Sequence, residues 1–484
     1  MSMERYNEEL IGMAVDLGMK AGAKEVIARL VEEDSYQIRF SNSSVDVIKR
    51  WDRYYLDLFL AKGHPLSLGK KITTLTIQDP DPNKIRASVP GEVKKLDALP
   101  SSKLYWGMDR EKHSSYPKVK GSYDTSIREL PEKAPGLIQD AIVGSEEAGA
   151  RKVAGVLHFG ESRCGLLTGY GNGGEHRSSH CTATIRSFLD SSSSGQSLVV
   201  TRNLSGIEDR LTQAGRKAGE LAKRSADAKE GREGTYDLIM SPTVGAQIFG
   251  SVIGSANPIM MIAGMSCLRG KLNEPVFPKF VSVTDDPLAP NGLNSRPFDA
   301  EGTPSRRTEL FRNGKFTGMI HNTSSAKLWK LMNWIKLKFS VRPTTTSNSE
   351  LGQMGMTGTE NDPRTLMPSP SNYVFKPGTY TLEEMISGST RPTIYLTSNW
   401  YTRFTSMSEG SFSTVPRDAM FIIDKGEIKR PLRNLRLKGN LLEMAKNVEC
   451  MGKDVDQIQW WEVSTPTFVP HIKVKNCTFT RART

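Results

Sequence analysis

The sequence predicts an α+β fold of two domains, with helices segregated from antiparallel or mixed sheets and a strand-rich C-terminal domain. The 484 residues are enough for two to four folding units, at roughly 100 to 200 residues each. Apolar residues at helical spacing and apolar residues in period-two alternation occur in separate blocks, which is typical of α+β proteins. Short strand-like runs bounded by turns dominate the second half.

The first half of the chain contains both kinds of pattern. Residues 4–20 have apolar side chains at helical spacing and predict an opening helix. Residues 25–65 alternate apolar and polar side chains around the turn-forming SNSS, which predicts antiparallel strands. Three further elements are expected: a loop leading into a short helix over 76–100, a longer helix over 131–151 and a strand over 153–159.

The clearest domain boundary follows a charged helix. The stretch IEDRLTQAGRKAGELAKRSADAKEGREG, residues 207–234, predicts a polar helix that ends in a Gly-rich linker. Beyond it, Pro, Thr and aromatic residues become more frequent. We therefore expect an N-terminal α+β domain over 1–234 and a strand-rich C-terminal domain over 235–484.

Two hairpins and a long loop are predicted in the second half. ELFRNGKFTGM indicates a hairpin turned at Asn313 and Gly314, and FIIDKGEIKRP a second one turned at Lys425 and Gly426, because both pairs suit a tight turn. Residues 344–365 include almost no bulky apolar side chain, which predicts a mobile surface loop.

The composition is that of a globular protein with an excess of positive charge. Charged residues make up 24% of the chain, and the net charge is +12. Basic residues are spread along the whole chain without a long basic block, which does not favour a specific nucleic-acid site. The five dispersed cysteines predict buried reduced thiols. No apolar run approaches the roughly 18 residues that a membrane helix needs, so we expect a cytoplasmic protein without a membrane segment.

GEHRSSH, residues 174–180, has the letters of a zinc-binding motif with the first two exchanged. A helix would bring two histidines four residues apart to one metal, and a Glu directly after the first His would activate water. Here Glu175 precedes His176, and Arg177 follows it. The period-two pattern after the Gly-rich stretch indicates a turn running into a strand, which would separate His176 from His180 by roughly 13 Å. An ordinary polar turn is favoured over a zinc site.

A dense string of residues lies beyond residue 281, in VTDDPLAPNGLNSRPFDAEGTPSRRTELFRNGKFTGM. It resembles the TldD/PmbA (TldE) family of metallopeptidases, also called modulators of DNA gyrase. The positions that carry the resemblance are Asp285, Asp286, Pro287, Gly292, Ser295, Phe298, Asp299, Glu301, Gly302, Asn313 and Gly314. Further matching segments follow in family order: 370–386, 409–413, 422–432, 438–454 and 465–470.

The same family predicts where a metal would be held. TldD-like members carry HExxxH on a helix after the linker, and PmbA/TldE-like members have the helix without those residues. SPTVGAQIFGSVIGSAN, residues 241–257, is that helix by its Ser N-cap, its Pro at the first position and its apolar stripe. The resemblance puts Gly250 at the first His, Ser251 at the Glu and Ser255 at the second His. None of them supplies a nitrogen ligand or a carboxylate base.

Three other features have a structural and a functional interpretation. Small residues along the helix at 250–255 favour close packing against a neighbouring element. The acidic residues of the family string could bind a hard cation. The favoured roles are a turn before Pro287 for Asp285 and Asp286, and capping or pairing with Arg296, Arg306 or Arg307 for Asp299 and Glu301. Residues 327–339 are basic and aromatic, and their place in the family pattern favours a partly buried segment or one that contacts a partner or peptide. CMGKD, from Cys450, aligns with a glycine-aspartate turn rather than with a TldD-like Cys ligand.

The resemblance implies a non-catalytic TldE/PmbA-like subunit. It would form a heterodimer with a TldD-like catalytic chain, and the two would enclose a cavity in which unfolded or short peptides are cleaved. Zinc is expected in that partner and no cofactor in this chain, which without the partner could form a homodimer. Two alternatives remain open: an independent metal-dependent peptidase that uses Glu175, His176 and His180, and a nucleic-acid or topoisomerase-associated binding protein.

Overall fold

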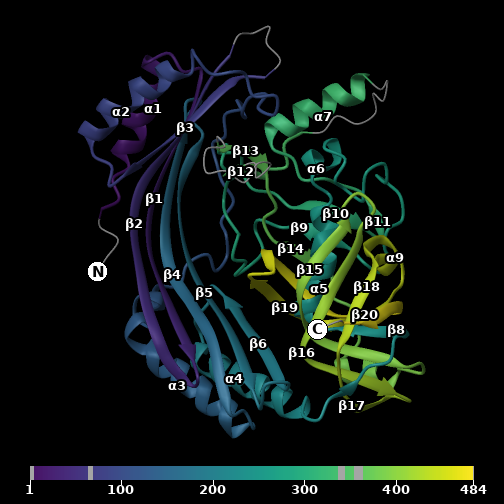
Figure 1. The fold of residues 1–484 in the computed structure, drawn as a ribbon. Helices are drawn as coiled ribbons and strands as arrows, with labels where there is room; N and C mark the ends of the chain where they lie inside the picture. Colours follow the sequence, from purple (N-terminus) through teal and green to yellow (C-terminus); the bar gives the residue numbers. More distant parts are fainter. Residues whose placement is uncertain (1–4, 64–68, 336–343, 354–363, 483–484) are drawn as a thin grey trace.

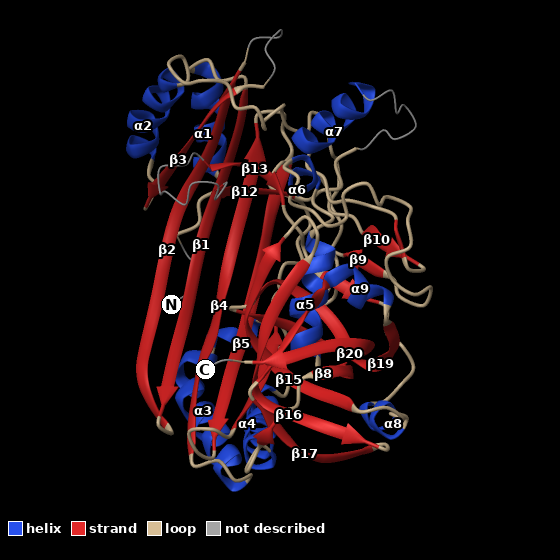
Figure 2. Ribbon diagram, turned by 45° about the vertical axis from the view of Figure 1, so that its right-hand side comes forward, coloured by secondary structure: helices blue, strands red, loops and turns tan. Residues whose placement is uncertain are grey.

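Two sheets face each other across the molecule (Figure 1). The computed structural model describes residues 5–63, 69–335, 344–353 and 364–482. Helices cover the face of the first sheet that is turned away from the second one, as the turned view also shows (Figure 2). The mixed helix and sheet content and the strand-rich second half confirm the predicted α+β class.

The first sheet is antiparallel throughout and has the strand order β3-β2-β1-β4-β5-β6. The predicted SNSS turn joins its two longest strands, and Asn42 and Ser43 have positive φ there. Residues 76–78, which were expected to lie in a loop, belong to a strand. The bounds are β1 (Glu25–Ser41), β2 (Ser44–Lys62), β3 (Lys71–Gln78), β4 (Lys152–Thr168), β5 (Gly173–Phe188) and β6 (Ser194–Thr201).

Strand alternation gives the first sheet two different faces. Even-numbered residues of β1, such as Val26 and Leu30, pack in the core under the helices, whereas Ile27 and Arg29 point toward the second half of the chain. The helices of the covered face are α1 (Glu9–Lys20), α2 (Pro82–Lys95), α3 (Leu130–Glu147) and α4 (Ile207–Arg224), with a 3-10 turn η1 at Thr125–Arg128.

The second sheet is mixed, and β20 lies at its centre beside β14, β8, β18 and β19. Both predicted hairpins are present, with positive φ at Asn313 and Gly314 and at Lys425 and Gly426. The bounds are β7 (Lys229–Glu230), β8 (Gly234–Met240), β9 (Val283–Asp285), β10 (Thr308–Arg312), β11 (Lys315–Phe316), β14 (Tyr373–Phe375), β15 (Thr393–Ser406), β16 (Ser411–Asp424), β17 (Glu427–Arg433), β18 (Leu435–Asn440), β19 (Val448–Trp460) and β20 (Val463–Arg481).

Helices of the second half pack on this sheet and around its edge. The segment 327–339 begins inside a helix, and its residues 336–339 lie outside the described part of the chain. Within the ranges described, no helix is both long and apolar enough to cross a membrane. The bounds are α5 (Pro242–Gly254), α6 (Pro258–Ile262), α7 (Thr323–Ile335), α8 (Leu382–Ser387) and α9 (Leu441–Lys446).

The predicted loop over 344–365 is wrong in part, because its two ends form a hairpin. Strand β12 (Ser349–Gln353) pairs antiparallel with β13 (Arg364–Pro368), and residues 354–363 between them lie outside the described part. Charged and apolar contacts together attach this hairpin to the first sheet, because Leu366 of β13 packs in a core with Ile27 and Phe59. Glu350 binds Arg29, and Arg364 binds Asp57. A count of bulky apolar residues could not detect such a strand pair.

The acidic residues of the family string are buried, and their contacts are structural. Asp286 accepts the Leu288 N–H at 2.9 Å, which fits the predicted turn before Pro287, and it also pairs with Arg307 at 2.6 Å. Asp285 accepts hydrogen bonds from the Asn348 side chain and from the backbone N–H of Ser371 at 2.7 Å. A carboxylate satisfied by such donors acts as a hydrogen-bond acceptor for the loop, so we favour a structural role over cation binding.

Asp299 and Glu301 accept backbone hydrogen bonds, which is the capping role of the two roles expected for them. The Asp299 carboxylate accepts N–H bonds from Glu301, Thr303 and Ser349 at 2.9 to 3.0 Å. Glu301 accepts an N–H bond from Asp109 at 3.0 Å. The two carboxylates therefore join backbone segments that are far apart in the sequence.

Above about pH 6.5, where the buried histidines are neutral in both the folded and the unfolded chain, the stability of the fold should decrease as the pH rises. Burial raises the pKa of Asp299 to about 6, and burial followed by the charge of Asp299 raises the pKa of Glu301 to about 8. In this range the folded chain keeps protons that the carboxyls of the unfolded chain have already released. The resulting contribution to stability is therefore complete below about pH 4.5 and is lost by about pH 8. Thermal unfolding measured across pH 5 to 8.5 checks this.

The Glu301→Gln variant isolates the cause. It should flatten the decrease of melting temperature with pH, whereas Glu129→Gln on the surface should leave the slope unchanged. The slope is the measured quantity, because a Gln amide also loses one acceptor and lowers stability at every pH. An identical slope in Glu301→Gln and the unmodified chain would contradict the prediction.

Candidate functional site

Helix α5 begins where β8 ends, and its N-terminus is held in place by Ser241. The Ser241 hydroxyl accepts the Val244 N–H at 3.4 Å and donates to the Thr397 carbonyl at 2.7 Å. Pro242 occupies the first helical position, where it loses no hydrogen bond. The predicted helix is therefore present. Its apolar stripe is buried in the core of the second sheet: Ile248, Phe249, Val252, Ile253 and Ala256.

A cavity of about 290 Å³ lies along the other side of α5. Gly250, Ser251 and Gly254 line it, opposite Tyr373 and Glu462. A methyl group added at Gly250 would meet no atom within 4 Å, and one at Gly254 would meet only the Tyr373 hydroxyl at 3.6 Å. The predicted close packing of these small residues is therefore wrong, because they face open space.

Close packing through glycine occurs in α4 instead. Gly215 lies against α3, and an added methyl group there would come within 2.0 Å of the Ala141 carbonyl oxygen. Gly219 makes the same kind of approach to Ser145, at 2.3 Å. Sequence spacing alone does not distinguish a glycine that allows two helices to touch from one that leaves a cavity.

The serine hydroxyls of α5 are neutral and already donate hydrogen bonds within the helix. The Ser251 hydroxyl donates to the Gln247 carbonyl at 2.9 Å, and the Ser255 hydroxyl donates to the Ser251 carbonyl at 3.0 Å. Glu462 supplies the carboxylate, and it accepts the Tyr401 N–H at 2.7 Å and a bond from the Gln247 amide. A metal with bound water needs about three protein ligands, and this set provides one carboxylate and no imidazole.

Exposed aromatic rings lie next to this cavity, which sequence reasoning missed. Trp400, Tyr401, Trp460 and Trp461 form a cluster with ring centroids 5.4 to 6.1 Å apart. Trp461 is 58% exposed and directly precedes Glu462. The doublet WW and the segment NWY were visible signals, but only the pairing of β15 and β19 with their neighbours brings them together. Such rings offer apolar contact area to a peptide or a protein.

The GEHRSSH stretch lies in β5, so its placement in a turn is wrong. The pairing of β4 with β5 extends to Leu167 and Gly173, which confines the turn to the residues between them. On a strand, Glu175 points to the face opposite His176 and His180. Glu175 pairs with Arg163 through two contacts of 2.7 Å.

The surroundings of the two histidines also oppose a cation. Burial, followed by the charges of Arg202, Arg296 and Arg29, lowers the pKa of His176 to about 4. Burial also lowers the pKa of His180 to about 4. Within the described residues, no group of three or more His, Cys, Asp or Glu side chains is arranged to hold a metal ion.

Cys450 is buried in β19 rather than located in the predicted turn. The strand continues through residues 450–454 with an irregular register, because β20 pairs with it on both sides of that segment. Burial raises the pKa of the Cys450 thiol to about 11, which keeps it protonated at neutral pH.

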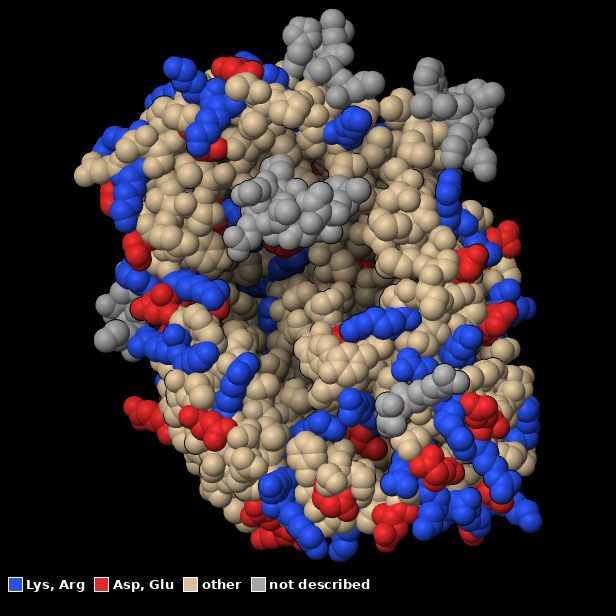
Figure 3. Space-filling model, in the orientation of Figure 1, with Lys and Arg blue, Asp and Glu red and all other residues tan. Residues whose placement is uncertain are grey.

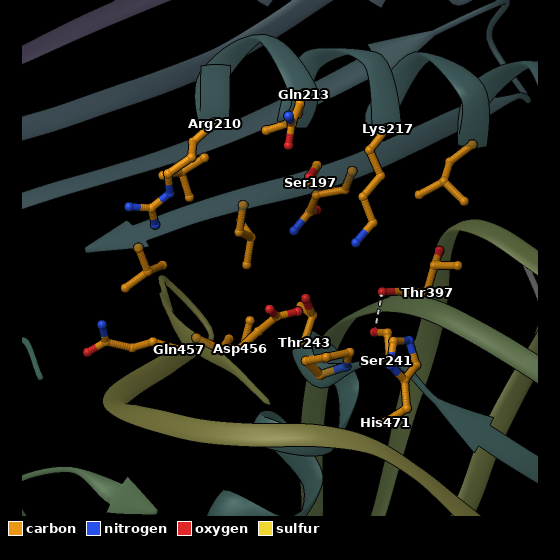
Figure 4. Close-up of a pocket in the computed structure, with 18 of the residues that line it drawn as sticks. Ser197, Arg210, Gln213, Lys217, Ser241, Thr243, Thr397, Asp456, Gln457 and His471 are labelled. Atoms are coloured by element: carbon orange, nitrogen blue, oxygen red, sulfur yellow. Dashed lines mark hydrogen bonds between the residues drawn. The ribbon is translucent and has the colours of Figure 1, made fainter. Parts of the chain in front are cut away.

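A second cavity, of about 280 Å³, lies at the N-terminus of α5. Figure 4 shows Lys217 reaching from α4 toward Ser241 and Thr397, with Asp456 and His471 on the opposite side. Burial, followed by the charge of Lys217, lowers the pKa of His471 to about 4. The walls of this second cavity come from four strands and two helices, so no single stretch of the sequence could indicate the cavity.

Filling the α5 cavity with one methyl group should stabilise the chain. Gly250→Ala removes a helix-interior glycine at a position with free space, so we expect a gain of roughly 0.5–1 kcal/mol in the free energy of unfolding. Gly215→Ala is the matched control in α4, and it should destabilise by about 1 kcal/mol or more because the methyl group meets Ala141. Chemical denaturation measures both, and a destabilised Gly250→Ala would restore the close-packing interpretation.

Comparisons with known proteins agree on one family. The family model for the PmbA/TldA metallopeptidase C-terminal domain matches residues 233–481, just over half of the chain. A metalloprotease of Methanothermobacter thermautotrophicus is 28% identical over 245 residues, which cover 50% of this chain and 48% of that protein. The matched part thus spans about half the length of this curated relative.

Solved structures share the fold over nearly the whole chain. TldE from Thermococcus kodakarensis has a TM-score of 0.77 at 16% identity and covers 97% of this chain and 100% of that one. A candidate DNA gyrase modulator from Thermotoga maritima has a TM-score of 0.77 at 19% identity, covering 98% of this chain and 100% of that one. With the family model, these matches show that the chain belongs to the PmbA/TldD family of metallopeptidase-related proteins.

Proposed function

We propose that this chain is a non-catalytic TldE/PmbA-like subunit of a peptidase complex. In this proposal it pairs with a TldD-like catalytic chain that holds the zinc ion. The two chains enclose a cavity in which unfolded or short peptides are cleaved, in the cytoplasm. Domains over 1–234 and 235–484 would provide the two sides of this chain's wall.

The carrying observation is the chemistry of α5. At the three positions where the family resemblance puts the ligands and the base, this chain has Gly250, Ser251 and Ser255. Both serine hydroxyls donate to carbonyls of their own helix. Peptide hydrolysis by a metal requires a cation to polarise the carbonyl and to lower the pKa of water. The cavity wall has the shape of a site and lacks the ligands for that cation.

The space available for a peptide supports the same proposal. Figure 3 shows a hollow between the two halves of the molecule, with Lys and Arg side chains inside it. The exposed rings of Tyr401 and Trp461, which rest on Trp400 and the buried Trp460, add apolar area beside the α5 cavity. A surface that offers apolar rings and cationic groups suits extended peptide chains of varied sequence.

Co-purification with a TldD-like chain from the same organism tests the proposal. We expect a stable pair, one zinc ion per pair, and cleavage of an unfolded peptide by the pair. This chain alone should give a cleavage rate indistinguishable from a blank without protein. Cleavage by the purified single chain, or zinc bound to it at one ion per chain, would overturn the proposal.

The histidine pair provides a control for an independent peptidase. The double substitution His176→Ala and His180→Ala should leave the zinc content of the pair unchanged, because Glu175 points away from both histidines and guanidinium groups surround His176. Loss of stoichiometric zinc in this variant would favour the cryptic site instead.

Nucleic-acid binding is the remaining alternative. Figure 3 shows basic and acidic side chains interspersed on the visible face, without a continuous basic stripe. We expect weak binding to duplex DNA that disappears between 50 and 200 mM salt, as for non-specific contacts. Sub-micromolar binding at roughly 150 mM salt, measured by fluorescence anisotropy, would contradict this expectation.

A further inference from the structure

A cavity separate from the α5 site lies between the inner face of the first sheet and the segment 293–300. Its volume is about 190 Å³. Three guanidinium groups line it: Arg29 from β1, Arg202 after β6, and Arg296. His176 from β5 lies beside them, with its ring 5.4 Å from that of Phe298. Strands and a buried segment hold all of these side chains, so the cluster is rigid.

Arg202 is buried without a carboxylate partner. It is 5% exposed, and its two terminal nitrogens donate to the backbone carbonyls of Ser295 and Leu293. No ion pair to Arg202 occurs within the residues that the structure describes, and its Nε has no hydrogen-bond partner. Burial lowers the pKa of Arg202 to about 10, which reflects a cation that carbonyls solvate and no anion neutralises.

Further buried donors around the same cavity are also unpartnered. Arg296 uses Nη1 for Glu350 at 3.1 Å, and its Nε and Nη2 have no partner. The Nε of Arg29 and the Nδ1 of His176 are likewise unpaired. Buried polar groups in native proteins normally have partners, so a concentration of free donors in one cavity indicates an acceptor-rich ligand.

The charges at the cavity favour an anion with a single charge. Arg29, Arg202 and Arg296 face two lining carboxylates, Glu350 and Asp299, which leaves one positive charge in excess. A dianion such as phosphate would be repelled by Glu350 and would exceed that excess. A carboxylate matches both the charge and the paired donors of a guanidinium.

We propose that this cavity binds the carboxylate of a peptide chain, held by Arg202 and Arg296 with His176 alongside. The proposal rests on the proposed function in one respect, because the peptide is taken to be a substrate or product inside the shared chamber. The site would orient a peptide by its C-terminal end or by an acidic side chain. This makes the chain a contributor to substrate selection although it lacks the metal.

Calorimetry on the purified chain alone tests the proposal at low salt. The probes are N-acetyl-alanyl-alanine, the same dipeptide with a C-terminal amide, and inorganic phosphate. We expect the acid to bind, and the amide and phosphate to bind at least about tenfold more weakly. Arg296→Gln should weaken binding of the acid by about tenfold or more, and Arg296→Lys should recover part of it.

Arg312→Gln is the matched control, since Arg312 is an exposed arginine that pairs with Glu309 on the surface. It should bind the acid as the unmodified chain does. Arg296 is the preferred position because Arg202 also anchors two backbone carbonyls, and its loss could unfold the segment. The melting temperature of Arg296→Gln, measured in parallel, shows that the variant is folded.

Four results would overturn the inference: no binding of the acid at millimolar concentration, equal binding of acid and amide, tighter binding of phosphate, or an unchanged affinity in a folded Arg296→Gln. The assay needs neither the partner chain nor cleavage. A failure here therefore leaves the proposed subunit role standing, and a failure to form the complex leaves this result interpretable.

Discussion

Hydrogen bonds from backbone N–H groups to the buried carboxylates of Asp299 and Glu301 connect the two halves of the molecule. Glu301 accepts from Asp109, which lies between α2 and α3, and from Thr323 at the start of α7. Asp299 accepts from Ser349 at the start of β12. The side chain of Phe298, from the same segment, packs in a core with Ile27 and Phe59 of the first sheet. Together with the ion pairs of Arg29 with Glu350 and of Arg364 with Asp57, these contacts set the distance between the sheets, on which both the hollow and the arginine cavity depend.

The family fold is built here around a helix whose open side has small residues. The N-cap, the proline start and the buried stripe of α5 are intact, and the cavity on its far side remains open. Substitution of bulky ligands by Gly and Ser would be expected to collapse a site if the surrounding side chains could move in. They do not, because Tyr373 and Glu462 belong to strands and hairpins that are fixed by their own pairing. The empty volume is therefore a property of the sheet as much as of the helix.

Local patterns predicted the elements whose cause is local. The helix at 241–257, the hairpins at Asn313 and Lys425 and the SNSS turn follow from capping residues and tight-turn preferences. The hairpin of β12 and β13 could not be found this way, because ion pairs to Arg29 and Asp57 and the packing of Leu366 on the first sheet hold it in place. Those partners lie some 300 residues earlier.

The candidate sites divide in the same manner. The family resemblance could indicate the positions Gly250, Ser251 and Ser255, but it could not indicate their environment. Small residues occur both where two helices pack closely and where a helix lines an open cavity. The sequence made His176 a candidate zinc ligand, whereas its neighbours in the structure are Arg202 and Arg296. Those arginines carry no motif, and only the folded chain shows that they meet at one place.

The central position of β20 affects how the chain folds during its synthesis. Strand β20 pairs with β8 on one side and with β14 on the other, and it also pairs with β18 and β19. During synthesis, β8 leaves the ribosome more than two hundred residues before β20 does. Until β20 has been synthesised, β8 and β14 lack the strand that pairs with both of them. Unpaired strand edges of this kind aggregate or recruit a chaperone. The first sheet needs no strand beyond β6 and can form while the rest is still being translated.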